Sequence, residues 1–79
     1  MAVTVRLFAA ARAAAGVSQL EVGAGLAQEI LDSLVTNYPD LQEILPRCSF
    51  LLNEIAVHSL STKLNDGDTL DVLPPFAGG

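Results

Sequence analysis

The fold of this chain is decided by the stretch Leu26-Ala27-Gln28-Glu29-Ile30-Leu31-Asp32-Ser33-Leu34-Val35-Thr36-Asn37-Tyr38. Its apolar side chains recur at steps of three and four residues, and polar side chains occupy the opposite side, which is typical of a helix that packs one face on a core. Pro39 ends the pattern, because a residue before proline is pushed out of the helical region. We therefore expect one main amphipathic helix over 26–38.

Two strands and a helical turn are expected before this helix. Residues 3–8 alternate β-branched or apolar side chains with polar ones, as a half-buried strand does. The segment 9–15 is nearly all alanine and should form a short helical turn that Gly16 ends. A second strand over 19–22, closed by the small residues 23–25, should run antiparallel to the first because the connection is too short for a crossover.

A short helix and a hairpin are expected after the main helix. Residues 40–46 repeat the helical pattern over one or two turns between two prolines. The apolar segments 50–52 and 55–57 follow, with Asn53-Glu54 between them as a tight turn. These segments should pair as a second antiparallel hairpin.

The last strand should complete an α+β fold. Asn65-Asp66-Gly67-Asp68 is a strong turn signal, since Asp-Gly readily supplies positive φ, and residues 70–73 then form the closing strand. One long helix across a mixed sheet fits this order of elements, with the first and last strands parallel and side by side. The residues expected in the core are Val3, Val5, Leu7, Leu20, Ile30, Leu34, Leu51, Val57, Leu64, Leu70 and Val72.

The end of the chain differs from everything before it: Leu73-Pro74-Pro75-Phe76-Ala77-Gly78-Gly79. Two prolines withdraw two backbone donors, so the closing strand must leave the sheet there as an extended peptide. The residues that follow bury little, and the glycines leave the tip narrow. We interpret this tail as a peptide that enters another protein, with Gly79 as the reacting end; the alternative is a frayed end whose Gly-Gly is idle.

Composition limits the possible functions. The 79 residues, 51% of them hydrophobic, are enough for one domain with one core. Cys48 is the single cysteine, which excludes an intramolecular disulfide. The sequence also has no cluster of cysteine and histidine residues that would indicate a metal site. No secretory signal or membrane-spanning run is visible, so we expect a cytoplasmic protein that does not bind membranes. The net charge of −5 argues against nucleic acid and favours a basic protein surface as partner.

Three local motifs give the chain a resemblance to a known family. They are Leu7-Phe8-Ala9 with Arg12, the turn sequence 64–68, and Pro74-Pro75-Phe76-Ala77-Gly78-Gly79. In these motifs, and over its whole length, the chain resembles the ubiquitin-like β-grasp sulfur carriers, and most of all the MoaD family, the small subunit of molybdopterin synthase. The resemblance implies one β-grasp domain over 1–79, with a sheet of about five strands and an extended tail from 74. Asn53-Glu54 departs from the family, in which many members carry a glycine at this turn.

The resemblance also implies a chemistry for the tail. An E1-like adenylating enzyme of the MoeB type would use ATP to adenylate Gly79, and the acyl-adenylate would accept sulfur to become a thiocarboxylate. Gly78 would keep the peptide narrow where it enters two active sites. The thiocarboxylate would give its sulfur to precursor Z, cyclic pyranopterin monophosphate, to build the molybdopterin dithiolene. The chain itself would bind no cofactor and contribute no catalytic groups.

The resemblance implies protein partners as well. The large catalytic subunit would be MoaE-like, in a heterotetramer of two small and two large subunits. Phe8, Val57 and Leu73 are candidates for an apolar docking patch and Arg12 for a polar contact at its rim, although ordinary packing or a solvated charge also accounts for them. The tail residues expected to contact the partner are Pro74, Pro75, Phe76 and Ala77.

Other functions remain open from the sequence. A sulfur carrier for thiamin, cysteine or tRNA thiolation, a modifier that is conjugated to lysines, and a plain binding module could all have this sequence. Cys48 and His58 could form a thiol and base, but no third orienting group accompanies them, so packing is the better interpretation of Cys48. Asp66, Asp68 and Asp71 lack the closing glutamate of a calcium loop, and we interpret the first two as turn residues.

Overall fold

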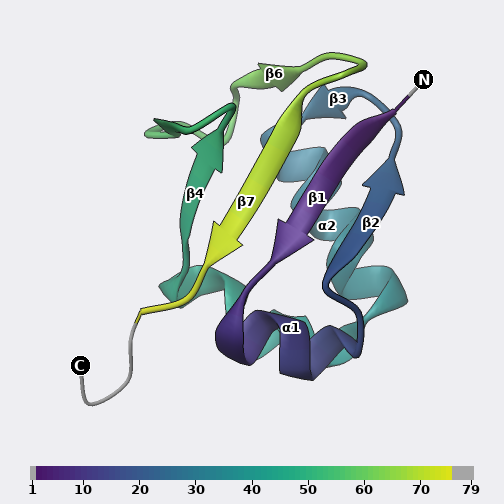
Figure 1. Cartoon of the computed structure of the whole chain (residues 1–79), viewed down its shortest axis with the longest axis vertical. Coiled ribbons are helices and arrows are strands. Elements are labelled where there is room, and N and C mark those ends of the chain that lie inside the picture. Colours follow the sequence, from purple (N-terminus) through teal and green to yellow (C-terminus); the bar gives the residue numbers. More distant parts are fainter. Residues whose placement is uncertain (1, 76–79) are drawn as a thin grey trace.

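Two strands from opposite ends of the chain form the middle of the sheet (Figure 1). In the computed structural model, which describes residues 2–75, β1 (Val3–Leu7) runs parallel to β7 (Thr69–Leu73). Val5 lies opposite Leu70 in this register. The full strand order is β2-β1-β7-β4-β5, so the predicted central pairing of the first and last strands is confirmed.

The two predicted hairpins, β1–β2 and β4–β5, supply the outer strands of the sheet. β2 (Gln19–Val22) pairs antiparallel with β1, and β4 (Ser49–Leu52) pairs antiparallel with β7 and with β5 (Ile55–Ala56). The tight turn between β4 and β5 places Asn53 and Glu54 at φ values of 50° and 72°. Both lie in the left-handed region, which a hairpin turn of two residues requires.

A second, two-stranded sheet was not predicted. β3 (Gly25–Leu26) pairs antiparallel with β6 (Lys63–Leu64), so residues 23–25 do more than close β2. The segment before β6 also supplies hydrogen-bond acceptors to the start of the main helix. The Ala27 and Gln28 N–H groups donate to the backbone carbonyls of residues 62 and 60. These are donors that a helix cannot satisfy internally.

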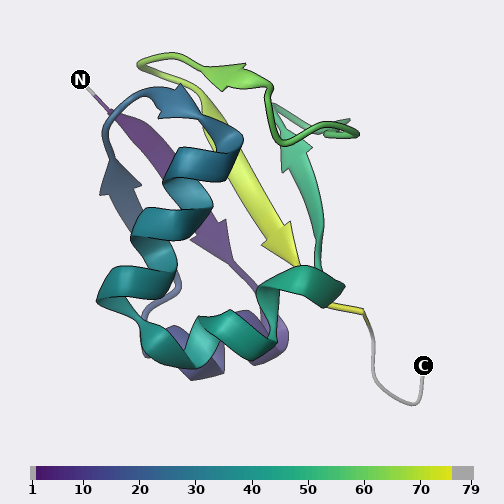
Figure 2. The same cartoon turned by 180° about the vertical axis from the view of Figure 1, so that it is seen from behind.

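The main helix, α2 (Ala27–Asn37), crosses one face of the sheet, as predicted (Figure 2). Its start is held by Glu29, whose carboxylate accepts the Leu26 N–H at 2.9 Å. The side chains that α2 buries on the sheet recur at steps of three and four residues, and they are Ala27, Ile30, Leu31 and Leu34. No helix within residues 2–75 is long and apolar enough to span a membrane.

The shorter helices close one end of the core. The alanine segment is a two-turn helix, α1 (Ala9–Ala15), and Gly16 ends it at φ 77°. The short helix expected over 40–46 is present as two 3₁₀ helices, η1 (Pro39–Glu43) and η2 (Leu45–Arg47). η1 begins at Pro39 and η2 has Pro46 as its second residue, and these are the two prolines that bounded the predicted helix.

The core lies between α2 and the sheet, and one predicted core residue was wrong. Leu51 pairs with Asp71 on the face turned away from the helices, while its neighbours Phe50 and Leu52 pack against the core. Leu20 and Val57 are half-buried against the core. The buried hydrophobic residues of this core are Val3, Val5, Leu7, Ala11, Ala27, Ile30, Leu31, Leu34, Leu41, Leu45, Leu64, Leu70 and Val72.

Candidate functional site

The chain leaves the sheet from the middle strand. β7 ends at Leu73, and Pro74 and Pro75 follow outside any regular element, as predicted. Pro74 is buried and Pro75 is exposed. Figure 1 shows that β7 stops at the end of the sheet where α1 lies. The predicted contact and reacting residues Phe76, Ala77, Gly78 and Gly79 lie outside the described residues.

Phe8 is an exposed aromatic residue beside the point where the chain leaves the sheet. Leu7 and Val72 are paired and buried in the core, so Phe8 and Leu73, one residue further along each strand, belong to the open face of the sheet. The Phe8 N–H donates to the Val72 carbonyl at 3.3 Å. Phe8 is 37% exposed and Leu73 is half-buried. The structure therefore brings together two of the three predicted apolar docking residues.

An ion pair lies next to these two residues on the open face. Arg6 Nε and Nη2 donate to the two carboxylate oxygens of Asp71 at 2.6 and 2.7 Å. Asp71 is 5% exposed, although α2 lies on the other face of the sheet. The hydrogen bonds and the charge of Asp71 raise the pKa of Arg6 above its usual value.

Arg6 also contacts the exposed ring. Its guanidinium carbon lies 5.7 Å from the centre of the Phe8 ring, within cation–π range. This cluster of Arg6, Asp71 and Phe8 was not predicted from the sequence. The signal was available in the register, because aligning 4–7 with 69–72 places Arg6 opposite Asp71.

Of the other two predicted contact residues, Arg12 lies beside Phe8, whose carbonyl accepts the Arg12 N–H at 3.3 Å, and Val57 lies elsewhere. Arg12 is exposed on α1, near Phe8 in sequence, and its carbonyl accepts the Gly16 N–H. Val57 is half-buried on the helix side of the sheet, where its N–H donates to the Phe50 carbonyl at 2.9 Å. Val57 is therefore separated from Phe8 and Leu73 by the sheet itself.

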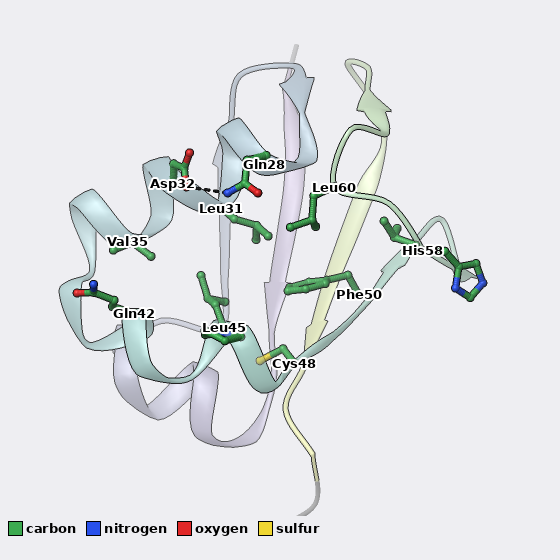
Figure 3. A pocket seen from close by; sticks show the side chains of 12 residues that line it. Gln28, Leu31, Asp32, Val35, Gln42, Leu45, Cys48, Phe50, His58 and Leu60 are labelled. Carbon is green, nitrogen blue, oxygen red and sulfur yellow. Dashed lines mark hydrogen bonds between the residues drawn. The ribbon is translucent and has the colours of Figure 1, made fainter.

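An apolar hollow of about 500 Å³ opens between α2, η2 and β4 (Figure 3). Leu31, Leu45, Phe50 and Leu60 point into it, and Cys48 lines its wall. The imidazole of His58 points away from the hollow in Figure 3.

Cys48 and His58 do not form a reactive pair in this arrangement. Burial raises the pKa of the Cys48 thiol, whose S–H donates to the Ile44 carbonyl at 3.3 Å. A raised pKa leaves the sulfur protonated and unreactive at neutral pH. The interpretation of Cys48 as a packing residue therefore has structural support.

Asp68 closes its turn, as the sequence predicted. Its carboxylate accepts the Asn65 N–H at 2.8 Å and the Asn53 side-chain amide at 3.0 Å. These hydrogen bonds hold the pKa of Asp68 below its usual value. Within residues 2–75, no three histidine, cysteine or acidic side chains come together as metal ligands would.

Comparison with known protein sequences identifies relatives of this chain. The ThiS family matches residues 5–79. The molybdopterin synthase sulfur carrier subunit of Chlamydomonas reinhardtii is 32% identical over 83 residues that cover 100% of both chains.

Solved structures agree. The solution structure of small archaeal modifier protein 1 from Methanosarcina acetivorans has a TM-score of 0.87 and 30% identity, and the match covers 98% of this chain and 95% of that one. A chain in the complex of subunits 1 and 2 of the molybdopterin-converting factor from Helicobacter pylori has a TM-score of 0.75 and 32% identity over 100% of both chains. The present chain therefore belongs to the ThiS family and has the ubiquitin-like β-grasp fold that its resemblance to MoaD predicted.

Proposed function

We propose that this protein is the sulfur-carrier small subunit of a molybdopterin synthase. The observation that carries the proposal is the exit of the chain from the central strand through Pro74 and Pro75, beside an open face that exposes Phe8. The full-length match to a molybdopterin synthase sulfur carrier subunit supports it. A body whose last strand ends at Leu73 and leads through two prolines toward a Gly-Gly sequence suits a donor that other enzymes load and unload.

The proposed chemistry takes place at Gly79. A partner enzyme joins the terminal carboxylate to the AMP of ATP and releases pyrophosphate, because a free carboxylate is a poor electrophile. Sulfur at the oxidation level of sulfide then attacks the acyl carbon, AMP leaves, and the product is a thiocarboxylate. Two such thiocarboxylates in turn supply the two sulfurs of the dithiolene built on precursor Z, and water returns each Gly79 to the carboxylate. Gly78 lets the peptide pass through narrow channels in both partners.

Two protein partners follow from this chemistry. The first is a MoeB-like activating enzyme, which binds the ATP. The second is a MoaE-like large subunit, in an assembly of two small and two large subunits. The Helicobacter pylori complex of subunits 1 and 2 supports a partner of the second kind.

We define the docking face as Phe8, Leu73 and Pro75, with Arg12 at its rim. These residues lie around the point at which the chain leaves the sheet, so a partner that receives the tail also meets them. An apolar centre with a polar rim is the usual anatomy of a protein interface. Val57 is left out because it packs on the other side of the sheet.

The test is anaerobic co-expression with the activating enzyme followed by intact-mass analysis. The expected product has one oxygen of Gly79 replaced by sulfur, and a variant that lacks Gly79 should stay unmodified. An unmodified wild-type mass, under conditions that load a known carrier, would overturn the proposal. Purification with the bound large protein then separates a molybdopterin pathway from thiamin, cysteine or tRNA thiolation.

A protein modifier is the second candidate. The likeness to small archaeal modifier protein 1 over nearly the full length of both chains favours it. The same activated Gly79 would then form isopeptide bonds with lysines. Gly-Gly remnants on lysines of digested cellular proteins, absent when Gly79 is deleted, would support this function over sulfur transfer.

A further inference from the structure

The Arg6–Asp71 pair has an unusual position for an ion pair. It joins the central strand β7 to its neighbour β1, yet it lies on the face of the sheet opposite α2. The Asp71 side chain is 7% exposed, whereas that of Arg6 is 42% exposed. The carboxylate is thus nearly hidden from water while the guanidinium extends over it to the surface.

The pair is more specific than a surface salt bridge. Both carboxylate oxygens accept a hydrogen bond from one guanidinium, at 2.6 and 2.7 Å, which fixes the plane of the group as well as its place. A lysine has no planar fork and could not be held in this way. The two hydrogen bonds therefore hold the Arg6 guanidinium in one orientation, although arginine side chains at a surface are usually mobile.

We propose that Arg6 is a positioning residue of the docking face: anchored by Asp71, it holds the ring of Phe8 beside Leu73 in the orientation that a partner meets. This inference rests on the proposed function, because it takes Phe8 as a docking residue. It adds a residue that lies beside the docking face and acts on it through Phe8.

The geometry gives the reason. Phe8 follows the last residue of β1, and 37% of its surface is exposed, so packing alone leaves its side chain a choice of staggered rotamers. The guanidinium carbon, 5.7 Å from the ring centre, favours the rotamer that keeps the ring over it. A ring already in its bound orientation loses less rotamer freedom when the partner arrives, which strengthens binding.

The first test uses the free protein and no partner. In NMR spectra, the Arg6 side-chain protons should show a ring-current shift that disappears in Phe8→Leu. The Phe8 Hα–Hβ couplings should report one dominant rotamer in the wild type and an average in Arg6→Met and Asp71→Asn. Arg6 protons at random-coil positions, or unchanged Phe8 couplings in the variants, would overturn the inference.

The second test is a double-mutant cycle for binding to the large subunit. Arg6→Met should raise the Kd by about two- to five-fold, the range of one exposed cation–π contact. The same change in a Phe8→Leu background should have no further effect, because no ring remains to be held. An equal rise in both backgrounds would mean that Arg6 touches the partner directly, and would overturn the positioning role.

Two further variants keep the result interpretable. Arg6→Lys retains the charge beside Asp71 but lacks the planar guanidinium, so it should also raise the Kd. It serves as a second variant in case Arg6→Met fails to fold. Lys63→Met removes one positive charge from an exposed residue of β6, a strand at the opposite end of the molecule from the exit in Figure 1, and should leave the Kd unchanged. An effect of Lys63→Met as large as that of Arg6→Met would show that only net charge matters, and would overturn the inference.

Different results would contradict the docking face and the positioning role of Arg6. If Phe8→Leu leaves the Kd unchanged, the docking face of the proposed function is wrong. If Phe8→Leu raises the Kd but neither Arg6 variant does, the docking face holds and the positioning role of Arg6 is wrong.

Discussion

Alanine substitutions at Leu70 and Leu73 should have opposite effects. Leu70→Ala should mainly lower the stability of the protein, and Leu73→Ala should mainly weaken docking. The two leucines lie on the same strand, β7, three residues apart, and they face opposite sides of the sheet. Leu70 is 1% exposed and sits between Val5 and Leu52 in the register. Leu73 is half-buried on the open face beside Phe8.

The expected losses of stability follow from this burial. Leucine to alanine removes about three CH₂ equivalents, or roughly 2.4 kcal/mol of transfer free energy when the side chain is fully buried, and an enclosed cavity raises the loss to about 3–5 kcal/mol. We expect that loss for Leu70→Ala. Leu73→Ala leaves no enclosed cavity and removes about half as much buried apolar surface, so we expect a loss of stability of about 1 kcal/mol.

Docking should respond in the opposite order. Leu73 lies in the proposed docking face, and truncating a buried interface anchor costs more than about 1.4 kcal/mol, which is tenfold in Kd. Leu70→Ala should leave the Kd within about twofold at a temperature where the variant is folded, because Leu70 faces the helices.

Urea unfolding followed by circular dichroism measures the first quantity, and calorimetric titration with the large subunit measures the second. A domain of this size has about 4–12 kcal/mol of stability in total, so the titration should be done well below the midpoint of Leu70→Ala. Equal stability losses in the two variants would refute the assignment of Leu73 to the open face. An unchanged Kd for Leu73→Ala would refute the docking face.

Further tests address the tail, an acid-sensitive turn and a strained turn. One alanine added after Gly79 should abolish sulfur loading in the intact-mass assay, because the reacting carboxylate is displaced, and loading of the extended chain would contradict the role of Gly79. The Asn65 and Asn53 hydrogen bonds hold the folded-state pKa of Asp68 below its ordinary value of 3.8, so their contribution to stability should be complete above that value and be lost as the pH falls through the lowered pKa. Thermal unfolding over an acid pH series should show a shallower decline for Asp68→Asn than for the wild type, and identical declines would argue against this network. Glu54→Gly should raise the free energy of unfolding by about 1 kcal/mol, because Glu54 has a φ of 72°, and a decrease in urea unfolding would mean that its side chain contributes more than its backbone strain.

The periodic elements could be predicted from sequence because each one repeats its signal. The main helix was expected over 26–38 and spans Ala27–Asn37, and β7 stops at Leu73, directly before Pro74. A helix period and a proline both act locally, so no tertiary information was needed.

The errors arose where the local signal is absent. Phe50, Leu51 and Leu52 are all apolar, so alternation could not show which of them faces the core, and the pleat placed Leu51 outside. Ala11 is fully buried, yet an alanine among alanines gives no hydropathy contrast.

Two other features depend on tertiary structure. β3 and β6 have two residues each, too few for any pattern, and exist because α2 and the segment before β6 lie side by side. The Arg6–Asp71 pair joins residues 65 positions apart and becomes visible only when the register of β1 and β7 is known.

The parallel pairing of β1 with β7 makes the body and the tail depend on each other. The tail follows the strand that fills the middle of the sheet, and the residues of β1 that pair with this strand lie 65 positions earlier in the chain. All the residues between them must therefore be complete before the two strands can meet, and such a long closure favours slow folding. A proteolytic cut or premature stop within β7 removes the glycine terminus and the centre of the sheet at once. A truncated product would thus unfold and be degraded before it could occupy a partner as an inert competitor.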